Sequence, residues 1–229
     1  MRCTAAGSFA SFYRLPFKAR IAAGAMILLV AGCTLLPPKQ DETRFIVLSS
    51  VAMADSNASA LTGGQKFAPK ATIGLGPIRL PEYLDRPELV IRASPNSLDL
   101  SRTERWAEPL SDNLRHVLAN NLTGLLGAIN IMQFPWYPGT RLDFVVQVQV
   151  QRFEADTNRK AELNATWELR TGQSNQVLAT RESQLTQLST SLAGDAVAAA
   201  LSKAVAELAE QIASAIVQAE QQRVAGARR

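Results

Sequence analysis

Few side chains of the kind that carry out catalysis occur in this chain of 229 residues. It contains one histidine, His116, and two cysteines, both near the N-terminus. Asp112 precedes His116 by four residues in a segment with helical spacing, and a carboxylate there could orient the imidazole for base chemistry. Such a pair is far more often an exposed pair on one helix face. With a single histidine the usual zinc ligands cannot be assembled, and a Ser-His-Asp triad would depend on this one residue. The sequence predicts no catalytic residue and no metal.

Carboxylates and glycine-rich segments offer two other kinds of chemistry. Asp85 and Glu88, with Glu108 further along, could serve glycoside hydrolysis, but the sequence gives these acids no special environment. The segments GGQK (63–66) and GLGP (74–77) lack the spacing of a phosphate-binding loop. We therefore expect neither an enzyme nor a bound cofactor. A carboxylate-based envelope hydrolase remains open as an alternative.

The excess positive charge lies entirely at the N-terminus. The chain carries 24 Lys and Arg against 20 Asp and Glu, and residues 1–32 contain four of the bases and none of the acids. Residues 33–229 are formally neutral, which excludes the electrostatic footprint of a nucleic-acid-binding protein. A hydrophobic fraction of 47% excludes disorder, and two cysteines cannot form a disulfide framework.

The first 33 residues have the order of a bacterial export signal. A basic stretch (14–20) precedes an uncharged apolar run (21–31), and small residues lead up to a cysteine. Val30-Ala31-Gly32-Cys33 resembles a lipobox, in which the cysteine is acylated and becomes the first residue of the mature protein. We expect residues 1–32 to be the signal peptide and Cys33 to be the lipid attachment site, for example for palmitate. The alternative is an uncleaved anchor helix with a chance cysteine.

The residues after Cys33 indicate how the protein is held at a membrane. Several acyl chains give stable attachment, whereas one chain holds only marginally. Thr34 stands where an aspartate would favour the inner membrane, so we expect anchoring in the outer membrane, facing the periplasm. Residues 33–43 are polar, contain Pro37-Pro38, and should form a lipidated tether.

Hydrophobic spacing predicts the helices and strands of the mature chain. The clearest alternation places Val146, Val148 and Val150 opposite three glutamines, as in a strand with one wet face, and two later segments should pair with it as a meander. Strands are expected at 44–50, 71–78, 88–93, 128–134, 141–153, 161–170 and 177–188, and amphipathic helices at 108–126 and 195–218. A long loop should occupy 52–70.

This pattern predicts an α+β fold with two layers. A mixed or mostly antiparallel sheet would carry two amphipathic helices packed on one face. The lysine and glutamates within 195–218 argue against a transmembrane span there. We expect one periplasmic domain over residues 44–220 and a flexible tail over 221–229.

Two segments, 73–92 and 105–110, contain prolines, aromatic residues and charged residues in patterns that helix or strand formation alone does not explain. In RLPEYLDRP two prolines fix the backbone, so this loop should present side chains from a stiff frame and suit contact with a partner. The candidate contact residues are Pro81, Glu82, Tyr83, Leu84, Asp85, Arg86 and Pro87. In the alternative, Tyr83 and Leu84 plug the end of the sheet while Asp85 and Arg86 pair locally.

The second segment, RWAEPL, is expected to be a structural motif at a helix entrance. Trp106 should pack as a lid, with Glu108 beside it. Pro109 would stand at a first-turn position, where no amide donor is needed.

At these residues the chain resembles a known family. GxGPxxLPEYLDRPxxVxR, then RWAEPL before a helix, then a Val/Gln strand, is similar to the PqiC-type auxiliary lipoproteins of ABC-transport systems. The resemblance covers nearly all of the mature chain. It implies a periplasm-facing lipoprotein of the outer membrane that works with MCE-domain (PqiB-like) proteins, which form tubes for lipid transport and help maintain membrane integrity. The family is not known for catalysis.

We therefore expect an accessory subunit of a PqiAB-type lipid transport system that docks on an MCE-domain tube. The neutral mature chain favours docking over binding of anionic lipid headgroups, which would require a basic patch. A ring-like homo-oligomer that caps the tube is left open. So is a periplasmic lipid carrier, which would need an apolar cavity between helices and sheet.

Overall fold

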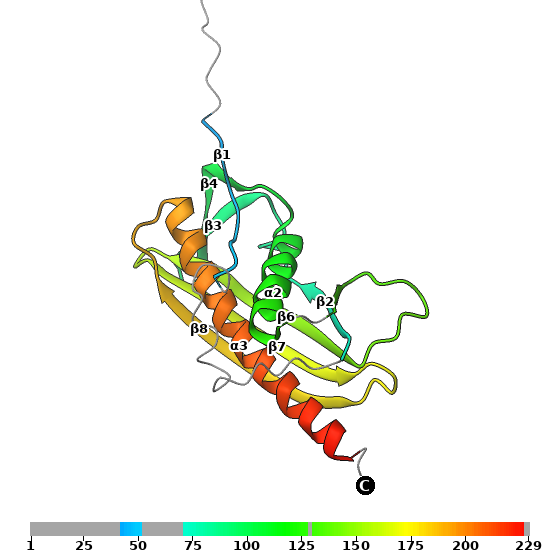
Figure 1. The fold of residues 1–229 in the computed structure, drawn as a ribbon. Helices are drawn as coiled ribbons and strands as arrows, with labels where there is room; N and C mark the ends of the chain where they lie inside the picture. Colours follow the sequence, from blue (N-terminus) through cyan, green and yellow to red (C-terminus); the bar gives the residue numbers. More distant parts are fainter. Residues whose placement is uncertain (1–41, 52–70, 128–129, 227–229) are drawn as a thin grey trace, which may run out of the picture. The chain divides into compact units, whose positions relative to one another are not determined.

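The computed structural model describes residues 42–51, 71–127 and 130–226 (Figure 1). The expected signal peptide, the lipobox, Cys33 and most of the tether therefore lie outside the described residues, as does the segment 52–70. Among the helices that are described, none is both long and apolar enough to cross a membrane.

The domain is built on one mixed sheet. Its strands are β1 (Arg44–Ile46), β2 (Ile73–Arg79), β3 (Glu88–Ser94), β4 (Ser97–Trp106), β5 (Ile131–Gln133), β6 (Phe144–Asp156), β7 (Lys160–Thr171) and β8 (Val177–Leu188). The order β1-β4-β3-β6-β2-β5 forms one path, and β7 and β8 continue from the other side of β6. β2 and β3 both run parallel to β6, whereas β6, β7 and β8 form an antiparallel meander.

The meander follows from alternation of buried and exposed side chains along the central part of β6 and along β7. Val146 and Val148 of β6 and Trp167 of β7 are buried, while the residues between them are partly or fully exposed. Val148 pairs with Trp167, and Gln149 pairs with Thr166, so apolar and polar side chains each meet their own kind across the ladder. The predicted strand with one wet face is confirmed.

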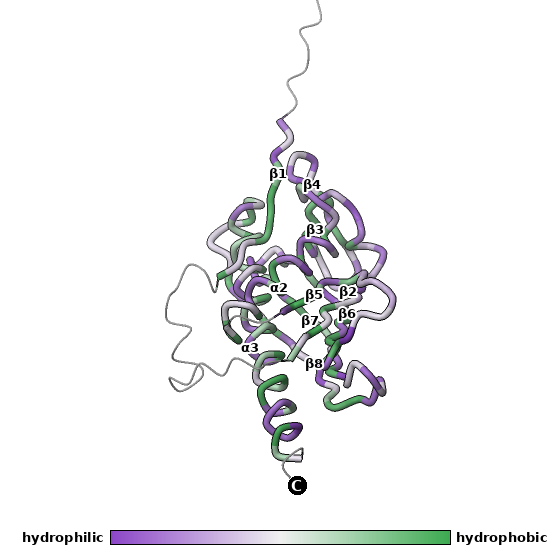
Figure 2. The backbone as a smooth tube through the Cα atoms, turned by 45° about the vertical axis from the view of Figure 1, so that its right-hand side comes forward, coloured by the Kyte–Doolittle hydropathy of each residue, from purple (hydrophilic) through white to green (hydrophobic). Residues whose placement is uncertain are grey.

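Two helices cover the apolar face of the sheet. α2 (Leu110–Leu126) and α3 (Gly194–Gly226) contact each other, and α3 also lies along β7 and β8 (Figure 1). The colour of α3 alternates between hydrophobic and hydrophilic along its length in Figure 2, as expected for an amphipathic helix. Fully buried side chains from both layers form the core, among them Leu114, Leu118, Val205, Leu208, Ile212, Phe144, Phe153 and Trp167. The predicted α+β class, with two helices on one face, is confirmed.

Each helix begins at a recognisable local feature. The carbonyl of Pro109 accepts hydrogen bonds from the amides of Asp112 and Asn113, and α2 starts at the next residue. The amide of Gly194 donates to the carboxylate of Glu104 at 2.6 Å, which places a negative charge at the N-terminus of α3. A Cβ at Gly194 would lie 2.9 Å from that carboxylate, so the end of the Glu104 side chain would have to shift if this residue carried a side chain.

Several predicted boundaries differ from the structure. β1 has three residues instead of seven, because the amides of Leu48 and Ser49 bond to helix side chains, those of Asn113 and Ser202. α3 continues to Gly226, past its predicted end at residue 218, so residues 221–226 of the predicted tail are helical. β4, ten residues long, was not predicted at all.

Candidate functional site

The candidate site lies where β6 changes its neighbour. β2 pairs with β6 up to Gln149, and β3 pairs with it from Ala155. Among the described strands, none pairs with residues 150–154 on this side, and the β6–β7 register shifts by a bulge at the same place. The chain that connects β2 to β3, residues 80–87, carries the LPEYLDRP motif. We call this segment the Tyr83 loop.

The Tyr83 loop is held by its own backbone. The amide of Leu84 donates to the carbonyl of Pro81 at 2.9 Å, and the amide of Arg86 donates to the carbonyl of Leu84 at the same distance. Leu84 is 2% exposed and belongs to the core. The loop is therefore an ordered turn with one apolar side chain fixed in the protein interior.

A buried carboxylate, Glu154, anchors the loop to β6. The hydroxyl of Tyr83 donates to Glu154 Oε2 at 3.0 Å and also lies 3.2 Å from the carbonyl oxygen of Gln151. Glu154, 1% exposed, is paired with Arg92 Nε at 2.7 Å and Arg152 Nε at 3.0 Å. Side chains from β3, β6 and the Tyr83 loop thus all contact the carboxylate of Glu154.

The electrostatics of this cluster favour the ionised carboxylate. Burial alone would raise the pKa of Glu154, but hydrogen bonds from Arg92, Arg152, the amide of Phe153 and Tyr83 more than offset it, so the pKa lies below its ordinary value. Burial and the negative charge of Glu154 raise the pKa of Tyr83 to about 12. At neutral pH the phenol therefore stays a donor and Glu154 an acceptor.

The second motif, RWAEPL, meets the first at the same place. The amide of Trp106 donates to the carbonyl of Pro87 at 2.7 Å, and the amide of Ala107 donates to the carbonyl of Ile46 at 3.0 Å. The buried Trp106 ring lies 6.5 Å from that of Phe153, the neighbour of Glu154 in β6. Two motifs that are separate in the sequence therefore support one stretch of β6.

Glu108 and Pro109 lie directly before α2. Pro109 precedes α2, one position before the predicted first turn. Glu108 accepts a hydrogen bond from Asn113 at 2.6 Å and lies 3.4 Å from His116 Nδ1. Trp106 is the last residue of β4 and is 5% exposed.

The predicted contact residues divide between interior and surface. Glu82, Asp85 and Pro87 are exposed, Pro81, Tyr83 and Arg86 are half-buried, and Leu84 is buried. Tyr83 and Leu84 are thus directed into the protein, as the plug interpretation expects. The local Asp85–Arg86 pair of that interpretation is not formed among the described residues, and Arg86 Nε is buried there without a hydrogen-bond partner.

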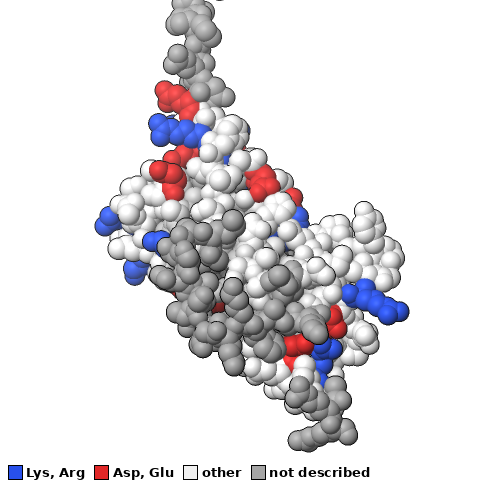
Figure 3. Space-filling view, viewed as in Figure 1, with Lys and Arg blue, Asp and Glu red and all other residues white. Residues whose placement is uncertain are grey.

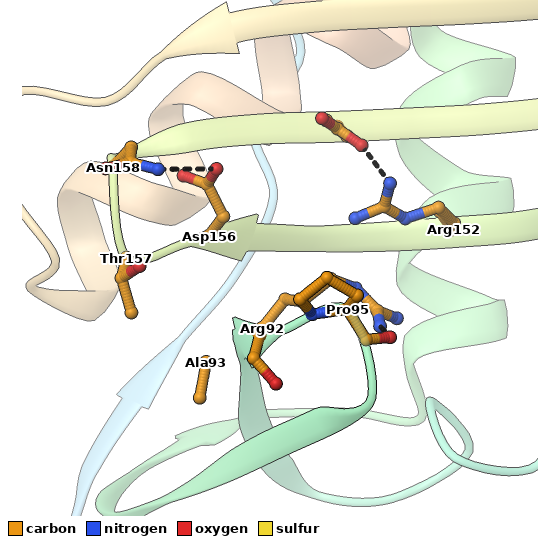
Figure 4. A pocket seen from close by; sticks show the side chains of 9 residues that line it. Arg92, Ala93, Pro95, Arg152, Asp156, Thr157 and Asn158 are labelled. Atoms are coloured by element: carbon orange, nitrogen blue, oxygen red, sulfur yellow. Dashed lines mark hydrogen bonds and ion pairs between the residues drawn. The ribbon is translucent and has the colours of Figure 1, made fainter.

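A polar pocket of about 530 Å³ adjoins the Glu154 cluster (Figure 4). Arg92 and Arg152 line one part of it, and both are already paired with Glu154. Asp156 ends β6 and Asn158 lies in the turn after it, and Asp156 accepts a hydrogen bond from the amide of Lys160. This mixed lining suits polar, hydrogen-bonding groups and not an acyl chain.

The side chains near His116 pair differently from the prediction. Asp112 pairs with Arg115 at 2.8 Å and His116 with Glu108, so the expected Asp112–His116 pair is not formed. The exposed position predicted for His116 is confirmed, with a side chain 46% exposed. No group of three or more potential metal ligands occurs within residues 42–51, 71–127 and 130–226.

Sequence reasoning did not single out Glu154 or Arg152. The only available signal was an acid that comes after the Val/Gln alternation in β6. Its significance depends on the change of pairing partner along β6, from β2 to β3, and no local sequence pattern reveals this change.

The sequence was compared with known proteins. The model of the family described as "ABC-type transport auxiliary lipoprotein component" matches residues 48–213. The chain belongs to this family. The resemblance to PqiC-type auxiliary lipoproteins is thereby confirmed. A search of curated proteins found no match.

Solved structures of similar fold support the architecture. One is the crystal structure of an uncharacterised protein, with 20% identity, a TM-score of 0.57, and coverage of 64% of this chain and 92% of the other. Another is a Xanthomonas campestris protein of the family DUF330, with 19% identity, a TM-score of 0.57, and coverage of 78% and 97%. At these identities the likeness shows a shared fold.

Family membership establishes the general role. As an ABC-type transport auxiliary lipoprotein, the chain is an auxiliary component that accompanies a transporter and is attached to a membrane through lipid. The Tyr83 loop and the RWAEPL segment both fall within the matched residues.

Proposed function

We propose that the protein is an outer-membrane lipoprotein, anchored through Cys33 and facing the periplasm. In this proposal it is the accessory subunit of an MCE/PqiAB-type system that moves lipids between the membranes and maintains envelope integrity. The domain docks on the periplasmic tube of an MCE-domain (PqiB-like) protein through the exposed part of the Tyr83 loop. The lipobox-like sequence and the family membership support the anchor and the transport role.

The observation that carries the docking site is the convergence of the two motifs on β6. The Tyr83 hydroxyl, Leu84 and the Pro87 carbonyl are all bound inside the domain. Glu82 and Asp85 are left exposed on a backbone that cannot readily rearrange. A partner that binds this loop would lose little conformational entropy, which favours a docking role.

Charge and packing favour docking over the two alternatives. Lys, Arg, Asp and Glu side chains lie dispersed over the face seen in Figure 3, with no gathering of one sign among its described residues. Helix and sheet side chains between the layers, such as Leu118, Leu208 and Trp167, are fully buried against one another, whereas a lipid carrier needs space there. Glu154, the most buried acid of the site, is already neutralised by two arginines, which does not favour a hydrolase.

A photo-crosslinking amino acid at Asp85 in cells tests this proposal. The account predicts covalent adducts with an MCE-domain protein. The same amino acid at Gln184, an exposed residue of β8, is the matched control and should give no such adduct. Adducts between two copies of the chain at either position would support the ring-like oligomer. Recovery of neither kind from Asp85 would overturn the docking role of the loop.

The anchor is tested separately by mass spectrometry of the mature N-terminus. We expect a chain that begins at Cys33 and carries acyl groups. A mature chain that keeps residues 1–32, or one with an unmodified Cys33, would contradict the anchor.

A further inference from the structure

A second loop with two prolines, residues 134–141, lies in the connection between β5 and β6. Unlike the Tyr83 loop, it directs aromatic side chains into solvent. Its sequence is FPWYPGTR, and we call it the aromatic loop. Tyr137 is 84% exposed and Phe134 is 39% exposed, and both are among the large apolar side chains that the domain leaves in contact with solvent. In Figure 1 this loop extends away from the sheet on the right of the view.

The aromatic loop is ordered by its own contacts. The amide of Phe134 donates to the carbonyl of Leu75 at 2.9 Å, and the amide and hydroxyl of Thr140 both donate to the carbonyl of Tyr137, at 3.1 and 2.7 Å. Gly139 has φ +84°, a value that suits glycine, and it closes the turn.

The ring of Trp136 braces the loop against the sheet. It meets the Phe134 ring edge to face at 5.2 Å. A Cβ on Gly74 of β2 would lie 3.1 Å from the Trp136 ring, so the indole packs over that glycine. Tyr137 is therefore held outward on a stiff support.

We propose that the aromatic loop binds the surface of the lipid bilayer to which the protein is anchored. Tyr and Trp prefer the boundary between headgroups and acyl chains, where an apolar ring and a polar tip are both satisfied. The segment 131–142 contains one base, Arg141, and no acid, so none of its side chains would be repelled by anionic headgroups. Asp143, the next acid, is engaged by the amide of Thr72 and lies 3.8 Å from Arg223.

The size of the loop favours a bilayer over a protein partner. A stable protein interface covers about 800 Å² on each partner, more than a narrow tip of eight residues can supply. A bilayer requires only a few inserted side chains, because the lipid anchor already keeps the protein close to it. Residues 33–43 can span at most about 36 Å when extended, so the domain remains near the membrane. The inference rests on the lipoprotein family and not on docking to a transporter.

Tryptophan fluorescence provides the test, because Trp106 and Trp167 are buried and Trp136 is only half-buried. The full mature lipoprotein is inserted into vesicles of phosphatidylethanolamine and phosphatidylglycerol, with or without dibrominated phosphatidylcholine. The vesicles are separated from unbound protein by flotation, and the tryptophan fluorescence of the vesicle-bound protein is measured. Bromine on the acyl chains quenches only an indole that contacts them. We expect quenching in the wild type and its loss in Trp136→Phe.

Tyr137→Asp keeps the brace intact and should abolish most of the quenching, because it places a charge at the tip. Leu188→Asp is the matched control, since it adds the same charge to another exposed apolar side chain, 68% exposed at the end of β8, and should leave the quenching unchanged. Circular dichroism melting confirms that each variant is folded. The proposal is overturned if wild-type emission is insensitive to bromine, if Leu188→Asp acts like Tyr137→Asp, or if Trp136 is shielded only after another protein is added. Any of these results leaves the Asp85 crosslinking test intact.

Discussion

The Tyr83 loop and the aromatic loop are both short, rich in proline and tied to β2 or β6, yet they direct their apolar side chains in opposite directions. Leu84 is buried and Tyr83 bonds to a buried carboxylate, so the first loop exposes mainly Glu82 and Asp85. The second exposes Tyr137 and Phe134. The loop that closes the sheet contains the LPEYLDRP motif on which the family resemblance rests, whereas the loop with the exposed aromatic residues is not part of that resemblance.

The two loops thus serve different needs of the domain: one completes the sheet beside β6, and the other is available for contact with the surroundings. The β6 strand needs a partner where β2 ends and β3 begins, and the Tyr83 loop supplies one. The aromatic loop supplies no core residue of comparable burial, so its sequence is free to serve contact with the surroundings.

The comparison is tested most strongly by truncating one apolar side chain in each loop. Leu84→Ala removes a buried side chain and should lower the free energy of unfolding by about 3 kcal/mol. Tyr137→Ala should change it by less than about 0.5 kcal/mol, because Tyr137 is exposed. Urea denaturation of both variants measures the difference. Equal losses would mean that the two loops are equally structural.

Neutralising the buried carboxylate should have the next largest effect. Glu154→Gln keeps the size of the side chain but weakens the contacts with Arg92 and Arg152, which should cost about 2 kcal/mol at neutral pH. Glu182→Gln, on the exposed face of β8, is the control and should cost almost nothing.

The same variant should change the dependence of stability on pH. The pKa of Glu154 is lowered in the folded state, so its contribution is present above the ordinary glutamate pKa of about 4.3 and is lost as the pH falls through the lower folded value. The free energy of unfolding of the wild type should fall more steeply below about pH 4.3 than that of Glu154→Gln. Parallel acid profiles would contradict the role of Glu154.

A smaller loss of stability than that of Glu154→Gln is expected when the hydroxyl of Tyr83 is removed. Tyr83→Phe should lower stability by about 1 kcal/mol. The phenol pKa is raised to about 12, so the contribution is present below the unfolded value of about 10 and is lost as the pH rises toward the folded one.

Phenolate absorbance checks that value in a chain with Tyr13 and Tyr137 replaced by Phe, since the sequence has three tyrosines. A midpoint near about 10 would show that Tyr83 is not held against Glu154.

Much of the fold could be predicted because its periodicity is local. The β6–β7–β8 meander and both helices repeat at periods that the sequence displays directly. β4 was missed because SLDLSRTERW lies near one edge of the sheet and buries only Trp106 fully, so no alternation is visible. The end of α3 was missed because its last residues are all exposed and carry no apolar stripe.

The site was predictable in position but not in its internal contacts. The prolines and aromatic residues of LPEYLDRP marked the loop, and its half-burial was one of two open interpretations. Glu154 lies 71 residues from Tyr83 in the sequence. The two meet only because β2 and β3, which the Tyr83 loop connects, both pair with β6. The aromatic loop was not singled out, since exposure of Tyr137 depends on where β5 and β6 leave the sheet.

The most direct test of the account compares photo-crosslinking from Asp85 and from Tyr137 in the same cells. Each position carries the crosslinker in a separate, otherwise unchanged chain, and adducts are analysed for both protein and lipid. We predict protein adducts that contain an MCE-domain partner from Asp85, and phospholipid adducts from Tyr137. Lipid adducts from Asp85 together with protein adducts from Tyr137, or the same products from both, would contradict the assignment of the two loops.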